Sequence, residues 1–184
     1  MDDDSEALRL DSLARLISLL ESIDGSKVTL IGDTMLDRYH HGFANNLNST
    51  APVPVLKITE SDESPGASAH IAIGLTSFGI DVSFHTAVGD DAEASSITTS
   101  LKSKDIRIDN VMRVKDRPTL TKIRFFASRE SLLDRRQILL QADRGPNEIL
   151  DESVSSSLTE SALANIPDSC ALVISDYDKG VVTK

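Results

Sequence analysis

The pattern of apolar and polar residues predicts an amphipathic helix at the start of the chain. Asp4 or Ser5 can cap its beginning, and Gly25 marks its end. Residues 1–26 are therefore predicted to form an N-terminal amphipathic helix. Its apolar stripe, at helical spacing, consists of Leu13, Leu16, Ile17, Leu20 and Ile23.

Two short apolar runs further along predict buried strands that end in an acid. Residues 28–31 stop at Gly32-Asp33, and residues 171–174 stop at Ser175-Asp176. Cys170 precedes the second run, which predicts a packed core thiol. Between the two runs, helical and strand periods alternate: helices at 66–78, 90–104 and 153–165, strands at 82–88 and 106–114. This alternation predicts a parallel α/β sheet that is covered on both faces.

Two extended stretches break the alternation and predict a small second sheet, such as a lid. Residues 52–58 contain two prolines, which predicts that this strand lies at an edge or outside the main sheet. Residues 119–127 alternate apolar with basic residues, the period of a half-exposed strand. The stretch at 42–50 is rich in Asn and Gly and is predicted to be a loop, as is the charged stretch 128–136. Residues 137–142 are predicted to be extended.

Charge and cysteine content narrow the classes of protein. The net charge of −10 disfavours a nucleic-acid surface, which needs clustered cations. A local basic group is better explained as a solvated strand and loop; it consists of Arg124, Arg129, Arg135 and Arg136. One cysteine allows neither an internal disulfide nor a structural zinc site. The acidic N-terminus is unlike a signal peptide and no apolar run is long enough to span a membrane, so the expected location is cytoplasmic.

Candidate chemistry lies where the strands end, since parallel α/β sheets bind ligands beyond the carboxyl ends of their strands. Asp33 and Asp37 could accept hydrogen bonds from the hydroxyls of a polyol, or one of them could cap a turn; the spacing favours neither. The small residues from Gly66 to His70 would let a ligand approach the backbone, but they suit close helix packing equally well. His70 could also be a core histidine.

Common nucleotide and hydrolase motifs are absent from the sequence. There is no Walker-type glycine loop and no Gly-x-Gly-x-x-Gly after a strand, which disfavours a nicotinamide-dependent oxidoreductase. No Gly-x-Ser-x-Gly elbow occurs. The residues alone therefore predict an α/β protein that binds a small polar ligand through Asp33 and Asp37.

Five segments, in this order, resemble the heptose-7-phosphate kinases of the ribokinase-like (PfkB) carbohydrate kinase family. They are IGDTMLDRY at 31–39, APVPV at 51–55, PGASAHIA at 65–72, RPTLTKIR at 117–124 and SDYDKG at 175–180. The resemblance runs from about Val28 to Thr183. It implies the N-terminal half of a three-layer α/β/α domain, at 27–184, with lid strands near 51–58 and 119–127.

The resemblance also implies an activity and a site. The expected reaction is transfer of the γ-phosphoryl group of ATP, with Mg²⁺, to a hydroxyl of a sugar phosphate. Homodimers through the β lid are expected. The implied sugar-binding residues are Asp33, Asp37, Gly66, Ala67, His70, Lys122, Arg124, Gln141 and Asp143, and the implied nucleotide-binding residues are Asp176 and Lys179.

This sequence departs from the family pattern at several of these positions. The family's paired glycines appear as Gly66-Ala67, its sugar-facing asparagine as His70, and an arginine as Gln141 in Gln141-Ala142-Asp143. Losing that arginine removes a bidentate anion clamp. The Gly-Ala-Gly-Asp helix start that supplies the catalytic base does not occur, so no catalytic residue is assigned.

Two expectations follow from the missing base. In the first, the natural chain continues past Lys184 and these 184 residues alone are inactive. A chain ending just after a buried strand would leave a sheet edge uncovered, which favours this expectation. In the alternative, the protein is a non-catalytic sugar-binding or dimerising module of the same fold.

Overall fold

The computed structural model describes residues 3–128, 137–146 and 148–182. Its main body is built on a four-stranded sheet whose strands all run parallel, in the order β5-β4-β1-β8. The strands are β1 Lys27–Gly32, β4 Asp81–Gly89, β5 Val111–Val114 and β8 Ala171–Ser175. The predicted strand at 106–114 is thus shorter than expected, because Ile106 packs into the core before the strand begins.

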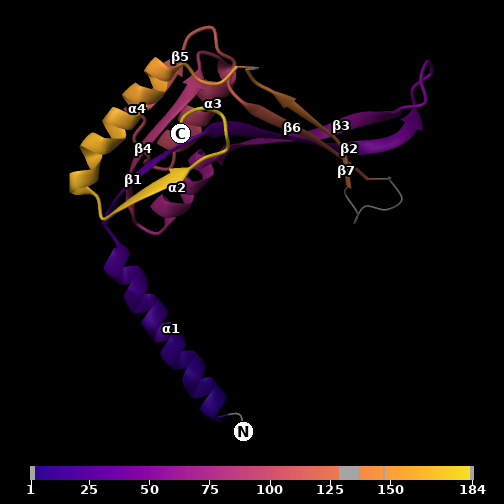
Figure 1. Ribbon diagram of the computed structural model, residues 1–184. Helices are drawn as coiled ribbons and strands as arrows, with labels where there is room; N and C mark the ends of the chain where they lie inside the picture. The colour runs from indigo at the N-terminus through magenta and orange to yellow at the C-terminus, as the bar shows by residue number, and fades with distance from the viewer. Residues whose placement is uncertain (1–2, 129–136, 147, 183–184) are drawn as a thin grey trace.

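Helices cover both faces of this sheet, which confirms the predicted α/β fold (Figure 1). One face packs against α2 Ser68–Ser77 and α3 Ala92–Lys102, in a core that includes Leu30, Phe84 and Ile97. The other face packs against α4 Glu152–Asn165, around Ile31 and Leu158, and a short 3-10 helix, η1 Ile166–Asp168, follows α4. Asp91 caps α3 by accepting a hydrogen bond from the Ala94 amide.

A second four-stranded sheet extends away from the body and forms the predicted lid (Figure 1). Its order is β3-β2-β6-β7, with β2 antiparallel to β3, parallel to β6, and β6 antiparallel to β7. The strands are β2 Thr34–Leu47, β3 Pro54–Ala67, β6 Thr121–Ser128 and β7 Gln137–Arg144. The proline-marked strand β3 lies at an edge, as predicted.

The lid is longer than the sequence suggested, and the loop predicted at 42–50 is wrong for most of its length. Strand β2 continues to Leu47 and pairs with β3 down to Pro54. Register shifts after His41 and Phe43 absorb the glycine and asparagines that suggested a loop, because a bulge tolerates residues that a regular ladder does not. Helix α2 likewise begins at Ser68, because β3 extends through Ala67.

Two predictions of burial are wrong. Strand β8 is an edge strand of the described sheet, and its side chains Leu172 and Ile174 are exposed. Cys170, just before it, is exposed rather than packed in the core. The apolar pattern correctly predicted a parallel strand at 171–174. Its residues and Cys170 are exposed because no element among the described residues covers the β8 edge of the sheet. Part of the predicted charged loop at 128–136, including Arg129, Arg135 and Arg136, lies outside the described residues.

The N-terminal helix α1, Asp3–Ile23, projects from the body instead of packing on it (Figure 1). Its predicted apolar stripe is therefore largely in solvent, and Leu13, Leu16 and Ile17 are each at least half exposed. The helix ends before Gly25, whose φ of 71° suits glycine. None of the described helices is long and apolar enough to cross a membrane.

Candidate site where the lid meets the body

Asp33 and Asp37, which the sequence could not rank, have different surroundings. Asp33 follows β1 and is 1% exposed. Its Oδ2 accepts hydrogen bonds from the amides of Tyr177 (2.8 Å) and Lys179 (3.1 Å), and its Oδ1 accepts one from Val181 (3.1 Å). These three backbone N–H donors compensate the buried negative charge of Asp33. In return, Asp33 fixes the 177–181 segment across the strand ends.

Asp37 is placed on the lid and lies in a polar row. Its Oδ1 accepts a hydrogen bond from Arg124 Nη1 at 2.6 Å, and this bond raises the pKa of Arg124. The Arg124 guanidinium also lies 5.4 Å from the centroid of the Tyr39 ring. A Cβ added to Gly66 would come within 2.2 Å of Asp37 Oδ2, so glycine is required for this carboxylate to lie where it does.

Three further predicted residues continue the row on strands β6 and β7. In the sheet register, Lys122 pairs with both Asp37 and Asp143, and Arg124 pairs with Gln141, so their side chains share one face of the lid. Asp143 accepts hydrogen bonds from Lys122 Nζ (3.2 Å) and Gln141 Nε2 (2.9 Å). Although burial opposes it, these bonds and the charges of Lys122 and Arg124 lower the pKa of Asp143.

A cleft of about 220 Å³ opens at the root of the lid, next to this row. Lys122, Arg144 and Lys179 bring three positive charges to its lining, of which Lys122 pairs with Asp143 in the lining and Arg144 pairs with Glu93 outside it. Such a cleft is suited to an anion, and the neighbouring carboxylates are suited to hydroxyl donors. Its lining residues are Met35, Leu120, Thr121, Lys122, Asp143, Arg144, Gly145, Pro146 and Lys179.

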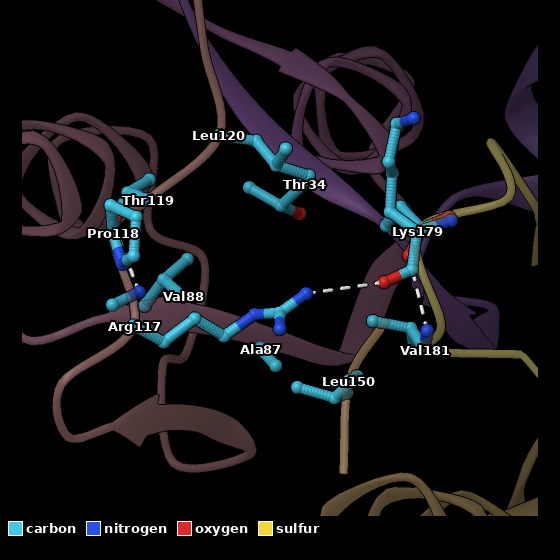
Figure 2. Close-up of a pocket in the computed structure, with 12 residues that line it drawn as sticks. Thr34, Ala87, Val88, Arg117, Pro118, Thr119, Leu120, Leu150, Lys179 and Val181 are labelled. Carbon is cyan, nitrogen blue, oxygen red and sulfur yellow. Dashed lines mark hydrogen bonds between the residues drawn. The ribbon is translucent and has the colours of Figure 1, made fainter. Parts of the chain in front are cut away.

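A much smaller cavity of about 10 Å³, which shares Leu120 and Lys179 with the cleft, lies between the strand ends and the 177–181 segment (Figure 2). Arg117 crosses it and donates to the carbonyls of Glu148, Ile149 and Lys179 at 3.1–3.4 Å. Burial lowers the pKa of Arg117, against the opposing charges of Asp33 and Glu148. Arg117 joins three backbone segments that form the floor of the site.

The sequence did not identify Arg117 as a site residue. It only marked Arg117 as the residue before Pro118 in a family segment. Its role depends on carbonyl groups 31, 32 and 62 residues further along the chain, which local spacing cannot reveal.

The remaining predicted residues are not all brought to this row. Ala67 caps α2 with φ 52°, a left-handed conformation that strains a non-glycine residue. His70 lies exposed in the first turn of α2 and, among the described residues, makes no hydrogen bond to the row. Asp176 is exposed and accepts a hydrogen bond from the Asp178 amide. Lys179 holds Asp33 through its amide and also lines the cleft.

Comparison with known proteins defines the class. The pfkB family carbohydrate kinase profile matches residues 26–162, and the chain belongs to this family. Among curated proteins, it is 32% identical over 165 residues to the bifunctional protein HldE of Chromohalobacter salexigens, and 35% identical over 159 residues to that of Pseudomonas syringae pv. tomato. These matches cover 90% and 86% of this chain but 33% and 31% of the relatives. The chain thus spans about a third of their length.

Solved structures support the fold. The phosphofructokinase-2 of Escherichia coli, in complex with substrates and products, matches with a TM-score of 0.61 at 19% identity, over 86% of this chain and 47% of that one. The same enzyme in complex with fructose-6-phosphate matches with a TM-score of 0.58 at 19% identity, over 82% and 45%. These similarities establish a ribokinase-like fold, as the sequence predicted.

Proposed function

We propose that this chain is the sugar-binding part of an ATP-dependent sugar-phosphate kinase whose acceptor is a heptose 7-phosphate or a close analogue. The observation that carries the proposal is the row of alternating acids and bases along one lid face, next to a cleft with three cations and one acid. Similarity to two HldE proteins at 32–35% identity supports it.

Each group in the row has a chemical role in this proposal. Asp37 accepts hydrogen bonds from sugar hydroxyls, since its carboxylate is partly exposed and held in place by Arg124. Lys122 and Lys179 bind the phosphate of the sugar phosphate, or the transferred group, as point charges. Gln141 cannot clamp an anion as an arginine would, but it orients Asp143 and thereby Lys122.

The proposed reaction also needs ATP and Mg²⁺. The described residues are suited to binding a phosphate group but not to holding the metal. Lys179 can bind a phosphate group, and Asp176 lies three residues before it. The described residues contain no cluster of three or more acidic, histidine or cysteine side chains placed to hold a metal. No step through the metal is therefore assigned to these residues.

A homodimer through the lid, in the cytoplasm where ATP is available, completes the proposal. Strand β7 is an edge of the lid sheet, and its Ile138 and Leu140 are more than half exposed. Exposed apolar residues on an edge strand are suited to pairing with a second copy. Sedimentation velocity measures this association directly.

Replacing Asp37 by asparagine tests the proposed sugar site. Asp37→Asn keeps the shape but removes the charged acceptor, so the affinity for heptose 7-phosphate should fall about 10- to 100-fold, as for loss of one hydrogen bond to a charged group. Titration calorimetry measures this affinity, and the affinity for a fluorescent ATP analogue should stay within about two-fold.

Asp62→Asn is the matched control, because Asp62 is an exposed acid of the same sheet that pairs with His41. It should bind heptose 7-phosphate like the unaltered chain. Equal affinity in the Asp37 and Asp62 variants would remove Asp37 from the site. ATP turnover is assayed on the protein as its own cells make it, because the 184 residues alone are expected to be inactive under either reading. Sugar-phosphate binding without turnover in that protein would favour the alternative, a non-catalytic sugar-binding module.

A further inference from the structure

The first turn of α3 contacts the root of the lid through two carboxylates. Asp91, which caps the helix, accepts hydrogen bonds from the Thr119 amide (2.8 Å) and hydroxyl (2.6 Å). Thr119 lies two residues before β6 and also accepts a hydrogen bond from the Gly89 amide at 2.9 Å. The start of β6 is therefore fixed to the end of β4 and to α3 at the same point.

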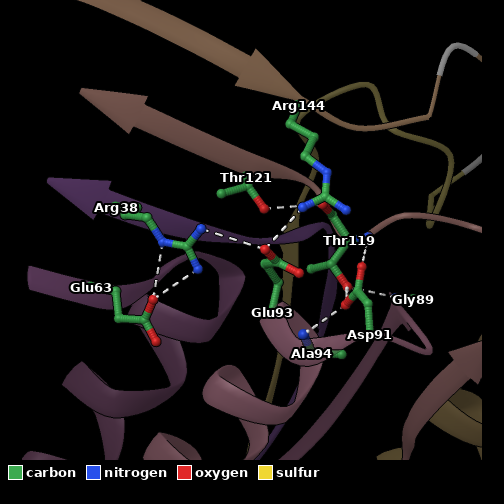
Figure 3. A network of polar contacts seen from close by, with 9 residues as sticks. All are labelled: Arg38, Glu63, Gly89, Asp91, Glu93, Ala94, Thr119, Thr121 and Arg144. Carbon is green, nitrogen blue, oxygen red and sulfur yellow. Dashed lines mark hydrogen bonds and ion pairs between the residues drawn. The ribbon is translucent and has the colours of Figure 1, made fainter. Parts of the chain in front are cut away.

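Glu93, two residues later, reaches the two strands on either side of β6 (Figure 3). Its Oε1 lies 3.4 Å from Arg38 Nη1 on β2 and 3.0 Å from Arg144 Nη1 on β7. The Glu93 side chain is only 9% exposed. A buried carboxylate is tolerated when cations compensate it, and here both cations come from the lid while the acid comes from the body.

We infer that Glu93 is a positioning residue that holds the lid at the angle at which its polar row faces the cleft. It joins β2, which carries Asp37, to β7, which carries Asp143. Arg144 directly follows Asp143 in β7. A movement of the Glu93–Arg144 ion pair therefore also displaces the Lys122–Asp143 ion pair. The expected effect on sugar-phosphate binding rests on the proposed function. The role of Glu93 in holding the lid does not.

Hydrogen exchange on the 184-residue chain, with and without Glu93→Gln, tests this inference. Amides of β6 and β7 should exchange at least about ten-fold faster in the variant, while those of β1 and β4 keep their rates, because the change opens the lid rather than the core. The affinity for heptose 7-phosphate should fall about ten-fold in calorimetry. Glu93→Asp, which keeps the charge but shortens the reach, should give intermediate values and serves if the glutamine variant does not fold.

Asp90→Asn is the matched control. Asp90 lies at the same end of α3 and loses the same charge, but its partner Arg113 belongs to β5 of the body. It should alter neither lid exchange nor sugar-phosphate affinity. A double variant Glu93→Gln/Arg144→Gln should exchange no faster than Glu93→Gln alone, because the two residues act as one pair.

Two results would overturn the inference: unchanged exchange in β6 and β7, or faster exchange with unchanged sugar-phosphate affinity. The second would leave Glu93 as a purely structural residue. Absence of heptose 7-phosphate binding by the unaltered chain would instead refute the proposed function. The exchange comparison would then still decide whether Glu93 holds the lid.

Discussion

Asp33 and Asp37 show how identical side chains four residues apart acquire different roles. The sequence predicted a carboxylate pair at the end of a strand, but the structure places only Asp33 there, directly after β1, and Asp37 lies within the lid strand β2. The sequence could not predict the hydrogen-bond partners of the two carboxylates. Those of Asp33 are backbone amides 144 to 148 residues away, and that of Asp37 is an arginine 87 residues away. Burial by distant segments, not local spacing, separates the buried Asp33 from the partly exposed Asp37.

Replacing Asp33 by asparagine should destabilise the protein by about 2–4 kcal/mol, because one of the two carboxylate positions becomes an NH₂ group facing backbone donors. Urea unfolding, with the midpoint and slope both fitted, measures this loss. Asp109→Asn, an exposed acid, should change stability by less than about 0.5 kcal/mol. A similar small change at Asp33 would show that the 177–181 segment does not depend on this carboxylate.

At the scale of elements, periodicity located most helices and strands but missed the length of the lid strands. Apolar and basic residues alternate along β6, so this strand was visible in the sequence, although its side chains are buried or half-buried and none is fully exposed. Strand β2 was not predicted at all, and composition suggested a loop at 42–50, whereas the actual length of the strand is fixed by pairing with β3. Pairing between strands is a property of the folded chain and leaves a weak trace in either strand alone.

Strand β4 contains a buried histidine that predicts acid sensitivity. His85 is fully buried; its Nε2 lies 2.9 Å from Ser83 Oγ, and its Nδ1 has no partner among the described residues. Burial lowers the pKa of His85 below that of an unfolded-state histidine, about 6.5. The unfolded chain therefore takes up a proton first, and stability falls as the pH drops from about 6.5 toward the folded-state pKa.

His85→Gln should remove this dependence. Unfolding free energies at pH 7.5 and 5.5 should converge in the variant, whereas the unaltered chain should lose up to about 1.4 kcal/mol per pH unit within the window. The exposed His70 provides the control, since His70→Gln should retain the loss. An unchanged pH dependence in the His85 variant would assign the acid sensitivity to other groups.

At the scale of the whole molecule, the fold class and the lid were predictable, because strand and helix periods alternate except where the lid sequence intervenes. The direction in which α1 projects was not predictable. Its amphipathic pattern normally indicates packing, yet its apolar stripe lies largely exposed.

Removing residues 1–19 should change the free energy of unfolding by less than about 0.5 kcal/mol, since the side chains of residues 5–19 are exposed and bury little apolar surface on folding. Denaturant titration of the shortened chain measures this. A loss of several kcal/mol would show that α1 packs against the body in solution.

The long reach of the Asp33 contacts has a consequence for synthesis on the ribosome. The carboxylate emerges early, but its amide donors at 177, 179 and 181 are made about 7–30 seconds later at typical elongation rates. During that interval β1 and β4 can pair, while Asp33 must stay hydrated because no donor for it exists yet. The floor of the site is thus completed late in synthesis. Until then, this end of the sheet must stay accessible to water so that Asp33 remains hydrated.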